Sequence, residues 1–293
     1  MSFSIVGPHW RKPTPVASDR LAVHDLTPDQ LQPISLQAVN GWDVRWQLML
    51  FRVLLPVNTL MRFGVDPITL TDAQGRPALR AIPGEGANSI RLELYHAADA
   101  VDALVEMELA DTPFNQLEVL WVAIQDPRAP RFDIDVMPDG ATTTLRGALR
   151  RNLLAEEAAL RAGLAPGQVR RGLGTLDRMA AHLESFMACL NQRQYFVQPL
   201  YYHTAVLFER LGFSYIYGQA RMEEIGRGFA PGGELRARLD GATPFRAPAL
   251  ADTVRGRAWA IHDGVMGRDW DRVRMVKRLG LHAGVDTCPN VPW

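Results

Sequence analysis

A glycine-rich turn in front of an amphipathic helix is the first feature of this sequence whose residue types could do chemistry. Gly172 and Gly174 precede residues 175–190, in which apolar side chains recur at helical spacing. A tight turn that opens a helix directs backbone N–H groups and the positive end of the helix dipole at whatever lies before it. A turn that simply requires small residues is the alternative. The predicted phosphate-binding segment consists of Arg170, Arg171, Gly172, Leu173 and Gly174.

Paired carboxylates offer a second kind of chemistry. In the segment 131–137, apolar residues alternate with Asp133 and Asp135, which predicts a strand with both carboxylates on one face. Such a pair can share a proton or act as a general base beside a bound amine. Glu106 and Glu108 repeat the pattern. A solvated sheet face is the alternative for both pairs.

Histidines in the last third of the chain suggest a third kind of site. His262 and Asp263 follow a short apolar run, His282 comes twenty positions after His262, and His203 is a spare ligand. Two histidines and a carboxylate can form a facial triad around a metal ion. The spacing is not diagnostic, and a His-Asp pair beside a glycine also fits a turn or a helix cap. We expect no metal here.

A second motif follows the amphipathic helix. Residues 195–200 have the composition of a strand, and residues 205–211 predict a short helix that Gly212 closes. With the glycine turn, this stretch resembles the GNAT-type acyl-CoA N-acyltransferase superfamily over about residues 164–218. Its motifs have the forms V-x-P-x-x-(Q/R)-x-x-G-x-G/A and N-x-x-A-x-x-x-Y-E-x-x-G-F, which this chain matches at Pro166, Gly172, Gly174, Glu209, Gly212 and Phe213.

This resemblance implies an acyltransferase that moves an acyl group from acyl-CoA, either acetyl-CoA or a longer one, to a small-molecule amine. It implies that the CoA pyrophosphate lies on the N–H groups of the glycine turn and that pantetheine runs along residues 131–137 or 195–199. Catalysis would then consist mostly of positioning. Asp135 is the expected base, and Tyr202 or Tyr215 is the expected acid.

The chain also departs from the family motifs. Val169 stands where Gln or Arg is usual, Tyr201 where Asn is usual, Thr204 where Ala is usual, and Phe208 where the family often keeps a Tyr as general acid. These departures motivate an alternative function, a non-catalytic GNAT-like binding or assembly protein. A second alternative is a metal-dependent enzyme that uses His262, Asp263 and His282.

The predicted fold class is α/β (α+β), with a mixed, mostly antiparallel sheet flanked by helices and a GNAT-like core. Strand patterns over 64–137 predict an antiparallel meander, and the apolar segment 42–63 predicts a helix that Pro56 interrupts. Residues 138–165 predict a helix. We expect three parts: an N-terminal arm over 1–40, the core over 41–225, and a C-terminal extension packed on the core over 226–293. Within that extension, residues 226–248 predict an ordered loop or a lid.

Composition excludes several classes of protein. The 293 residues contain 32 Lys and Arg and 32 Asp and Glu, so the net charge is zero and a general nucleic-acid binder is not expected. Cys189 and Cys288 form no CxxC pair, which argues against a disulfide framework and favours a reducing compartment. No segment has the length and apolarity of a membrane span or a signal peptide. We therefore expect a cytoplasmic protein without a membrane span, and a homodimer is compatible with the sequence.

Overall fold

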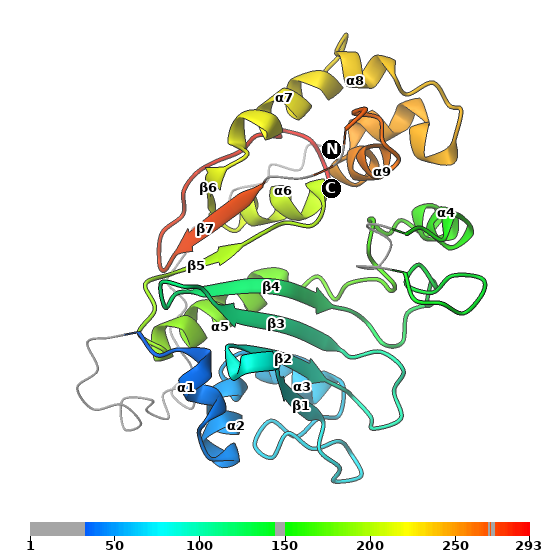
Figure 1. The fold of residues 1–293 in the computed structure, drawn as a ribbon. Coiled ribbons are helices and arrows are strands. Elements are labelled where there is room, and N and C mark those ends of the chain that lie inside the picture. The colour runs from blue at the N-terminus through cyan, green and yellow to red at the C-terminus, as the bar shows by residue number, and fades with distance from the viewer. Residues whose placement is uncertain (1–32, 144–149, 269, 271–272) are drawn as a thin grey trace, which may run out of the picture.

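The computed structural model describes residues 33–143, 150–268, 270 and 273–293. Most of the predicted N-terminal arm and residues 144–149 of the predicted helix over 138–165 lie outside these ranges. The remainder of that prediction is wrong at its start, because residues 138–143 are not helical and the described helix is Leu153–Arg161. In the part of the chain that is described, seven strands form one sheet in the order β1-β2-β3-β4-β5-β7-β6 (Figure 1). The strands are β1 (Leu79–Pro83), β2 (Ser89–Leu94), β3 (Val105–Asp111), β4 (Leu117–Ile124), β5 (Gln194–Val197), β6 (Ser214–Tyr217) and β7 (Arg274–Arg278).

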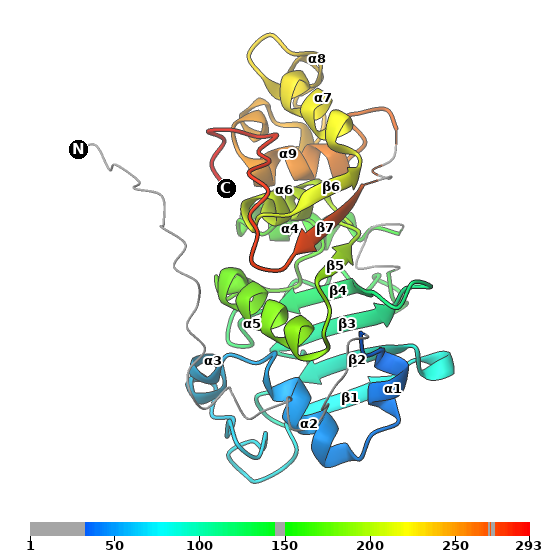
Figure 2. The same ribbon diagram turned by 90° about the vertical axis from the view of Figure 1, so that its left-hand side faces the viewer.

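Helices flank this sheet along its length (Figure 2). The α-helices within the described ranges are α1 (Leu36–Asn40), α2 (Val44–Arg52), α3 (Val57–Arg62), α4 (Leu153–Arg161), α5 (Leu176–Cys189), α6 (Tyr202–Arg210), α7 (Gln219–Phe229), α8 (Glu234–Ala237) and α9 (Val254–His262). The predicted fold class, a mixed and mostly antiparallel sheet flanked by helices, is confirmed. No helix among the described residues has the length and apolarity that crossing a membrane requires.

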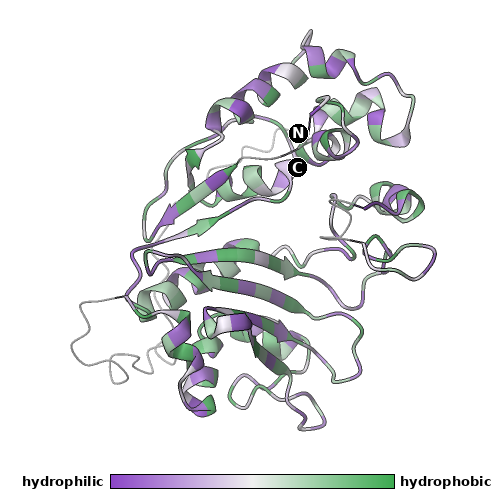
Figure 3. Ribbon diagram, in the orientation of Figure 1, coloured by the Kyte–Doolittle hydropathy of each residue, from purple (hydrophilic) through white to green (hydrophobic). Residues whose placement is uncertain are grey.

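Local patterns explain most of these elements. Val105, Met107 and Leu109 of β3 point into the core and alternate with half-buried glutamates, an alternation visible as bands in Figure 3. The predicted break at Pro56 is confirmed, because α2 ends at Arg52 and Pro56 is the N-cap of α3.

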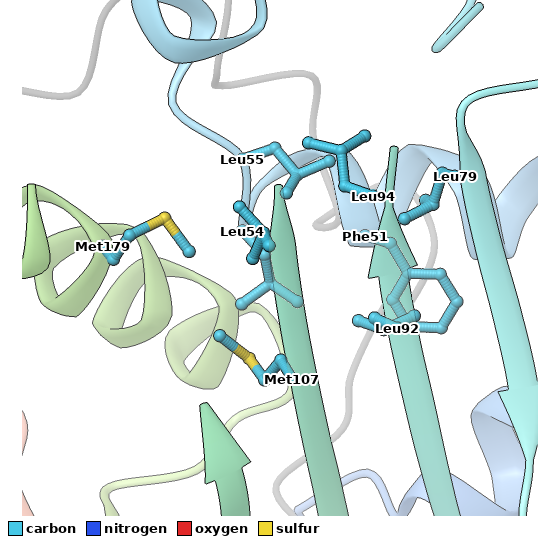
Figure 4. A pocket seen from close by; sticks show the side chains of 9 residues that line it. Phe51, Leu54, Leu55, Leu79, Leu92, Leu94, Met107 and Met179 are labelled. Atoms are coloured by element: carbon cyan, nitrogen blue, oxygen red, sulfur yellow. The ribbon is translucent and has the colours of Figure 1, made fainter. Parts of the chain in front are cut away.

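The packing on the α2 side of the sheet leaves one small void. It has a volume of about 10 Å³ and is lined only by apolar side chains, among them Phe51 of α2, Met107 of β3 and Met179 of α5 (Figure 4). A dry space of this size holds no ligand. It is a packing feature of the main core.

The strand predicted over 131–137 is wrong. These residues form turns with a single isolated bridge between Val136 and Thr142. The Arg131 guanidinium pairs with Asp133 and with Asp135, at 2.7 Å from the latter. Residues four apart in a strand are separated by about 13 Å, so the chain must fold back to bring both carboxylates to one side chain.

The C-terminal part of the chain completes the sheet. Strand β7 is hydrogen bonded to β5 on one side and to β6 on the other, both antiparallel. Val273 and Met275 are buried there, and the Lys277 ammonium donates to the carbonyl groups of Leu211 and Leu281 at 2.9 and 2.7 Å. The sheet therefore crosses the predicted boundary between residues 225 and 226.

Candidate functional site

The parallel strands β4 and β5 diverge within the sheet. Their pairing covers only Leu117–Val119 against Tyr195–Val197, and beyond it β4 continues to Ile124 while β5 ends. A cavity of about 740 Å³ lies at this divergence. Its described lining comes from β4, from the segment 162–176 that leads into α5, from the end of β5 with α6, and from Arg255 and Trp293.

A bulge shapes the wall that β4 contributes. Glu108 of β3 faces Trp121 and Leu109 faces Val119, so Leu120 is an extra residue on β4. Among the described residues, no named strand pairs with the cavity-facing edge of β4 beyond Val119, and an isolated bridge between Gln125 and Gly172 closes the end of this edge. The stretch of this edge between Val119 and the bridge is therefore where an extended ligand could add to the sheet.

The N-terminus of α5 forms a second wall. The first helical hydrogen bond runs from the Met179 N–H to the Thr175 carbonyl at 3.0 Å. The five amides from Gly174 to Arg178 donate to no other described residue, whereas the amide of Leu173 follows the bridge that joins Gly172 to Gln125. The buried Thr175 hydroxyl also has no hydrogen-bond partner among the described residues. Because α5 has 14 residues, the positive end of its dipole adds to these donors. This wall is suited to an anion.

All five residues of the predicted phosphate-binding segment line the cavity, but its two arginines differ. Arg170 is held by Asp102 at 2.8 Å and by the carbonyl of Ala129. The Arg171 side chain is exposed and makes no ion pair with a described residue. Arg171 is therefore the arginine of this segment that remains available to a ligand.

A corner of the cavity combines residues that are distant in the sequence. Arg255 lies over the Trp293 ring, with 5.8 Å between the guanidinium carbon and the ring centre, and the His203 ring is 5.9 Å from the same indole and 5.5 Å from Tyr201. Burial, with smaller contributions from His262 and Arg255, lowers the pKa of His203 to about 3. His203 is therefore neutral at physiological pH, and its Nδ1 is buried without a hydrogen-bond partner among the described residues.

None of the three predicted catalytic residues is among the residues that line the cavity. Asp135 is bound to Arg131, as described above. The buried Tyr202 hydroxyl donates to the Cys288 Sγ at 3.2 Å, and the Tyr215 hydroxyl donates to Glu209. Burial raises the pKa of both tyrosines, assisted by Cys288 for Tyr202 and by Glu209 for Tyr215. The structure does not bring these three groups together.

The predicted metal ligands are also apart. His262 contacts Glu156 at 3.1 Å and the Tyr201 ring at 5.6 Å, near the start of α6. His282 contacts the carbonyl of Arg210, the last residue of α6. A helix of nine residues is about 13 Å long, so the two histidines lie at opposite ends of α6. The described residues contain no group of three His, Cys, Asp or Glu that could hold a metal ion.

The segment 226–248 does not cover the cavity. Phe229 and Phe245, the two aromatic residues expected to anchor or close it, are buried, and Phe245 packs on Trp259 with 5.2 Å between the ring centres. No residue of this segment lines the cavity. Of the two interpretations of this segment, its buried aromatic side chains favour a fixed element of the helical layer.

Nothing in the sequence pattern indicated Arg255, and His203 and Tyr201 were expected in other roles. No local pattern connects Arg255, in the first turn of α9, with a glycine turn about eighty positions earlier. A signal was present for His203, because it lies within the predicted helix motif next to Thr204. Comparisons with protein-family models, with curated proteins and with solved structures found no match for this chain. What the cavity binds is therefore inferred from its own geometry.

Proposed function

We propose that this protein is an acyltransferase that moves an acyl group from acyl-CoA to an amine. One observation carries the proposal: a single cavity joins the divergence of two parallel strands to a helix N-terminus whose amides have no acceptor in the described structure. This arrangement offers an extended backbone edge and an anion site on the same surface. Pantetheine and pyrophosphate, the two parts of CoA nearest the thioester, need these two features in that order.

In this proposal the pyrophosphate accepts hydrogen bonds from amides between Gly174 and Arg178 and pairs with Arg171. The pantetheine amides pair with the free edge of β4, and the thioester lies near the bulge at Leu120. The site of the glycine turn is the one that the sequence predicted. Of the two pantetheine paths that the resemblance implied, residues 131–137 form no strand, whereas residues 195–199 include the end of β5, which also lines the cavity.

The chemistry assigned to the cavity is an aminolysis. The amine nitrogen bonds to the thioester carbonyl carbon, the carbon–sulfur bond breaks, the amine loses a proton, and the leaving thiolate gains one. None of the described lining residues is a carboxylate, and the low pKa of His203 makes it a weak base. The proposal therefore assigns most of the rate acceleration to holding a neutral amine against the thioester.

A binding protein without turnover is the second candidate. It is favoured by the same lack of a carboxylate among the described lining residues, and by Phe208, which lines the cavity without a hydroxyl group. The two candidates share the CoA site. They differ only in whether free thiol appears when amines are added.

Titration with CoA, acetyl-CoA and longer acyl-CoA thioesters tests the site. Two glycines form a matched pair for mutation: Gly174 with φ 67° in the cavity, and Gly75 with φ 75° in a remote turn, both with open space where a Cβ would lie. We expect Gly174→Asp to abolish binding, because it places a carboxylate before the α5 amides, and Gly75→Asp to bind like the wild type. Absence of binding by the wild type, or equal binding by both variants, would refute the proposal.

A further inference from the structure

Arg255 lacks the partners that other partly buried arginines of this protein have. Its Nε is buried without a hydrogen-bond partner, and it forms no ion pair with a described residue. Arg151 and Arg274 also have a buried nitrogen without a hydrogen bond, yet they pair with Glu156 at 2.6 Å and with Glu118 at 3.3 Å. A half-buried guanidinium without an anion is costly unless a ligand supplies one.

The surroundings of Arg255 add to this cost. Arg255 is the second residue of α9, so its charge lies near the positive end of that helix dipole. Burial, and then the charge of Arg171, lower its pKa from the usual value. Arg171 lines the same cavity as Arg255, and its positive charge is close enough to disfavour the charged form of Arg255.

The position of this guanidinium is well defined. Thr253 caps α9 by accepting from the Gly256 N–H at 2.9 Å, and a Cβ at Gly256 would lie 2.3 Å from the Leu250 carbonyl oxygen. Nη1 of Arg255 would lie 3.3 Å from a Cβ built on Gly163, and the Trp293 ring covers the guanidinium. A fixed helix therefore holds the cation at the wall of the cavity.

We infer that Arg171 and Arg255 form a phosphomonoester subsite in the corner of the cavity beside Trp293, and that this subsite takes the 3′-phosphate of CoA. The inference rests on the proposed function. A phosphomonoester carries nearly two negative charges at neutral pH, and three terminal oxygens match two guanidinium groups better than a single carboxylate does. Arg171 directly precedes the amides assigned to the pyrophosphate, so one nucleotide can reach both anion sites.

The test compares CoA with 3′-dephospho-CoA by calorimetric titration of the wild type, Arg255→Gln and Arg171→Gln. Arg45→Gln is the control, because Arg45 is 85% exposed on α2 and does not line the cavity. A charge-assisted contact of this kind predicts that the wild type prefers CoA by about tenfold or more. We expect Arg255→Gln to reduce this preference with dephospho-CoA affinity unchanged. Arg171→Gln should reduce the preference and also weaken binding of dephospho-CoA, because Arg171 is assigned to the pyrophosphate as well. Arg45→Gln should retain the preference.

The outcomes separate this inference from the proposed function. Equal affinity of the wild type for both ligands, or a full preference in Arg255→Gln with intact thermal unfolding, overturns the subsite while leaving the CoA site in place. A preference that survives while Arg255→Gln raises KM for carboxylate-bearing amines assigns the corner to the acceptor and also overturns the subsite. If the wild type binds neither ligand, the proposed function fails, and the subsite fails with it.

Discussion

The two ends of α9 handle charge in opposite ways. At its C-terminal end, Asp263 pairs with Arg151 at 3.2 Å and with Arg246 at 2.9 Å, while His262 contacts Glu156, which also pairs with Arg151. At its N-terminal end, Arg255 lies beside an aromatic ring and a second arginine and has no carboxylate partner among the described residues. Buried charges that neutralise each other stabilise a fold. A buried charge that stays unpaired destabilises it, which is the usual condition of a binding site.

The same difference distinguishes the predicted metal ligands from Arg255, which the sequence did not indicate. His262 and Asp263 were candidate metal ligands, yet both contact charged partners within the protein. Arg255 was not a candidate, although its guanidinium has no anionic partner among the described residues. The interactions of a side chain in the folded protein distinguish the two cases, whereas the residue types do not.

The largest expected effect comes from breaking the paired end. Glu156 is 1% exposed, and Glu156→Ala leaves Arg151 and His262 without their buried carboxylate. We expect the free energy of unfolding to fall by about 3–5 kcal/mol, measured by urea denaturation. The neighbouring Glu157 pairs with the exposed Arg161 and with no other described cation, so Glu157→Ala should cost about 1 kcal/mol or less. Similar losses in the two variants would contradict the comparison.

A smaller effect should appear with pH at the unpaired end. The pKa of His203 falls from 6.5 to about 3 on folding. As the pH drops below the unfolded value, the unfolded chain takes up the proton first, so stability is lost progressively down to the folded pKa. From about pH 7 to about pH 5 this residue should remove about 2 kcal/mol of unfolding free energy. Urea curves of the wild type and His203→Gln should therefore converge as the pH falls, and parallel pH profiles would show that His203 is not buried as a neutral group.

The smallest effect is expected from Arg255 itself. Because its charge is unpaired, Arg255→Gln should change the free energy of unfolding by about 1 kcal/mol or less, and an increase is as compatible with the comparison as no change. Thermal and urea unfolding without ligand measure this. A loss as large as that of Glu156→Ala would mean that the guanidinium has a structural partner after all. The inference of a ligand site at this corner would then lose its basis.

Local sequence patterns predicted the parts of the site that belong to one stretch of chain. The glycine turn, helix α5 and helix α6 up to Gly212 were all expected from spacing, and Gly212 has the positive φ of 84° that favours glycine at a helix end. Such features depend on side-chain periodicity and on backbone conformation within a few residues. They leave a signal that needs no knowledge of the rest of the fold.

The misplaced catalytic residues show where this signal ends. The alternation around Asp133 and Asp135 is typical of a strand, but Arg131 with its carboxylates and the contact of Phe132 with the Val169 backbone fold the segment into turns. Tyr202 begins α6, which was predicted over residues 205–211, and Tyr215 lies in β6, yet both hydroxyl groups donate to partners that do not line the cavity. The sequence can predict that a helix or strand forms. It does not predict in which direction one of its side chains points in the packed protein.

The sequence by itself determined that this chain forms a mixed sheet with helices and that a glycine turn precedes one of these helices. Only the tertiary structure decided that β7 enters the sheet between β5 and β6, and that α9 brings Arg255 to the cavity that Gly172 also lines. The physical reason is the range of the forces involved. Helix spacing and turn conformation act between near neighbours, whereas strand order and the pairing of buried charges depend on segments that meet only after the chain has folded.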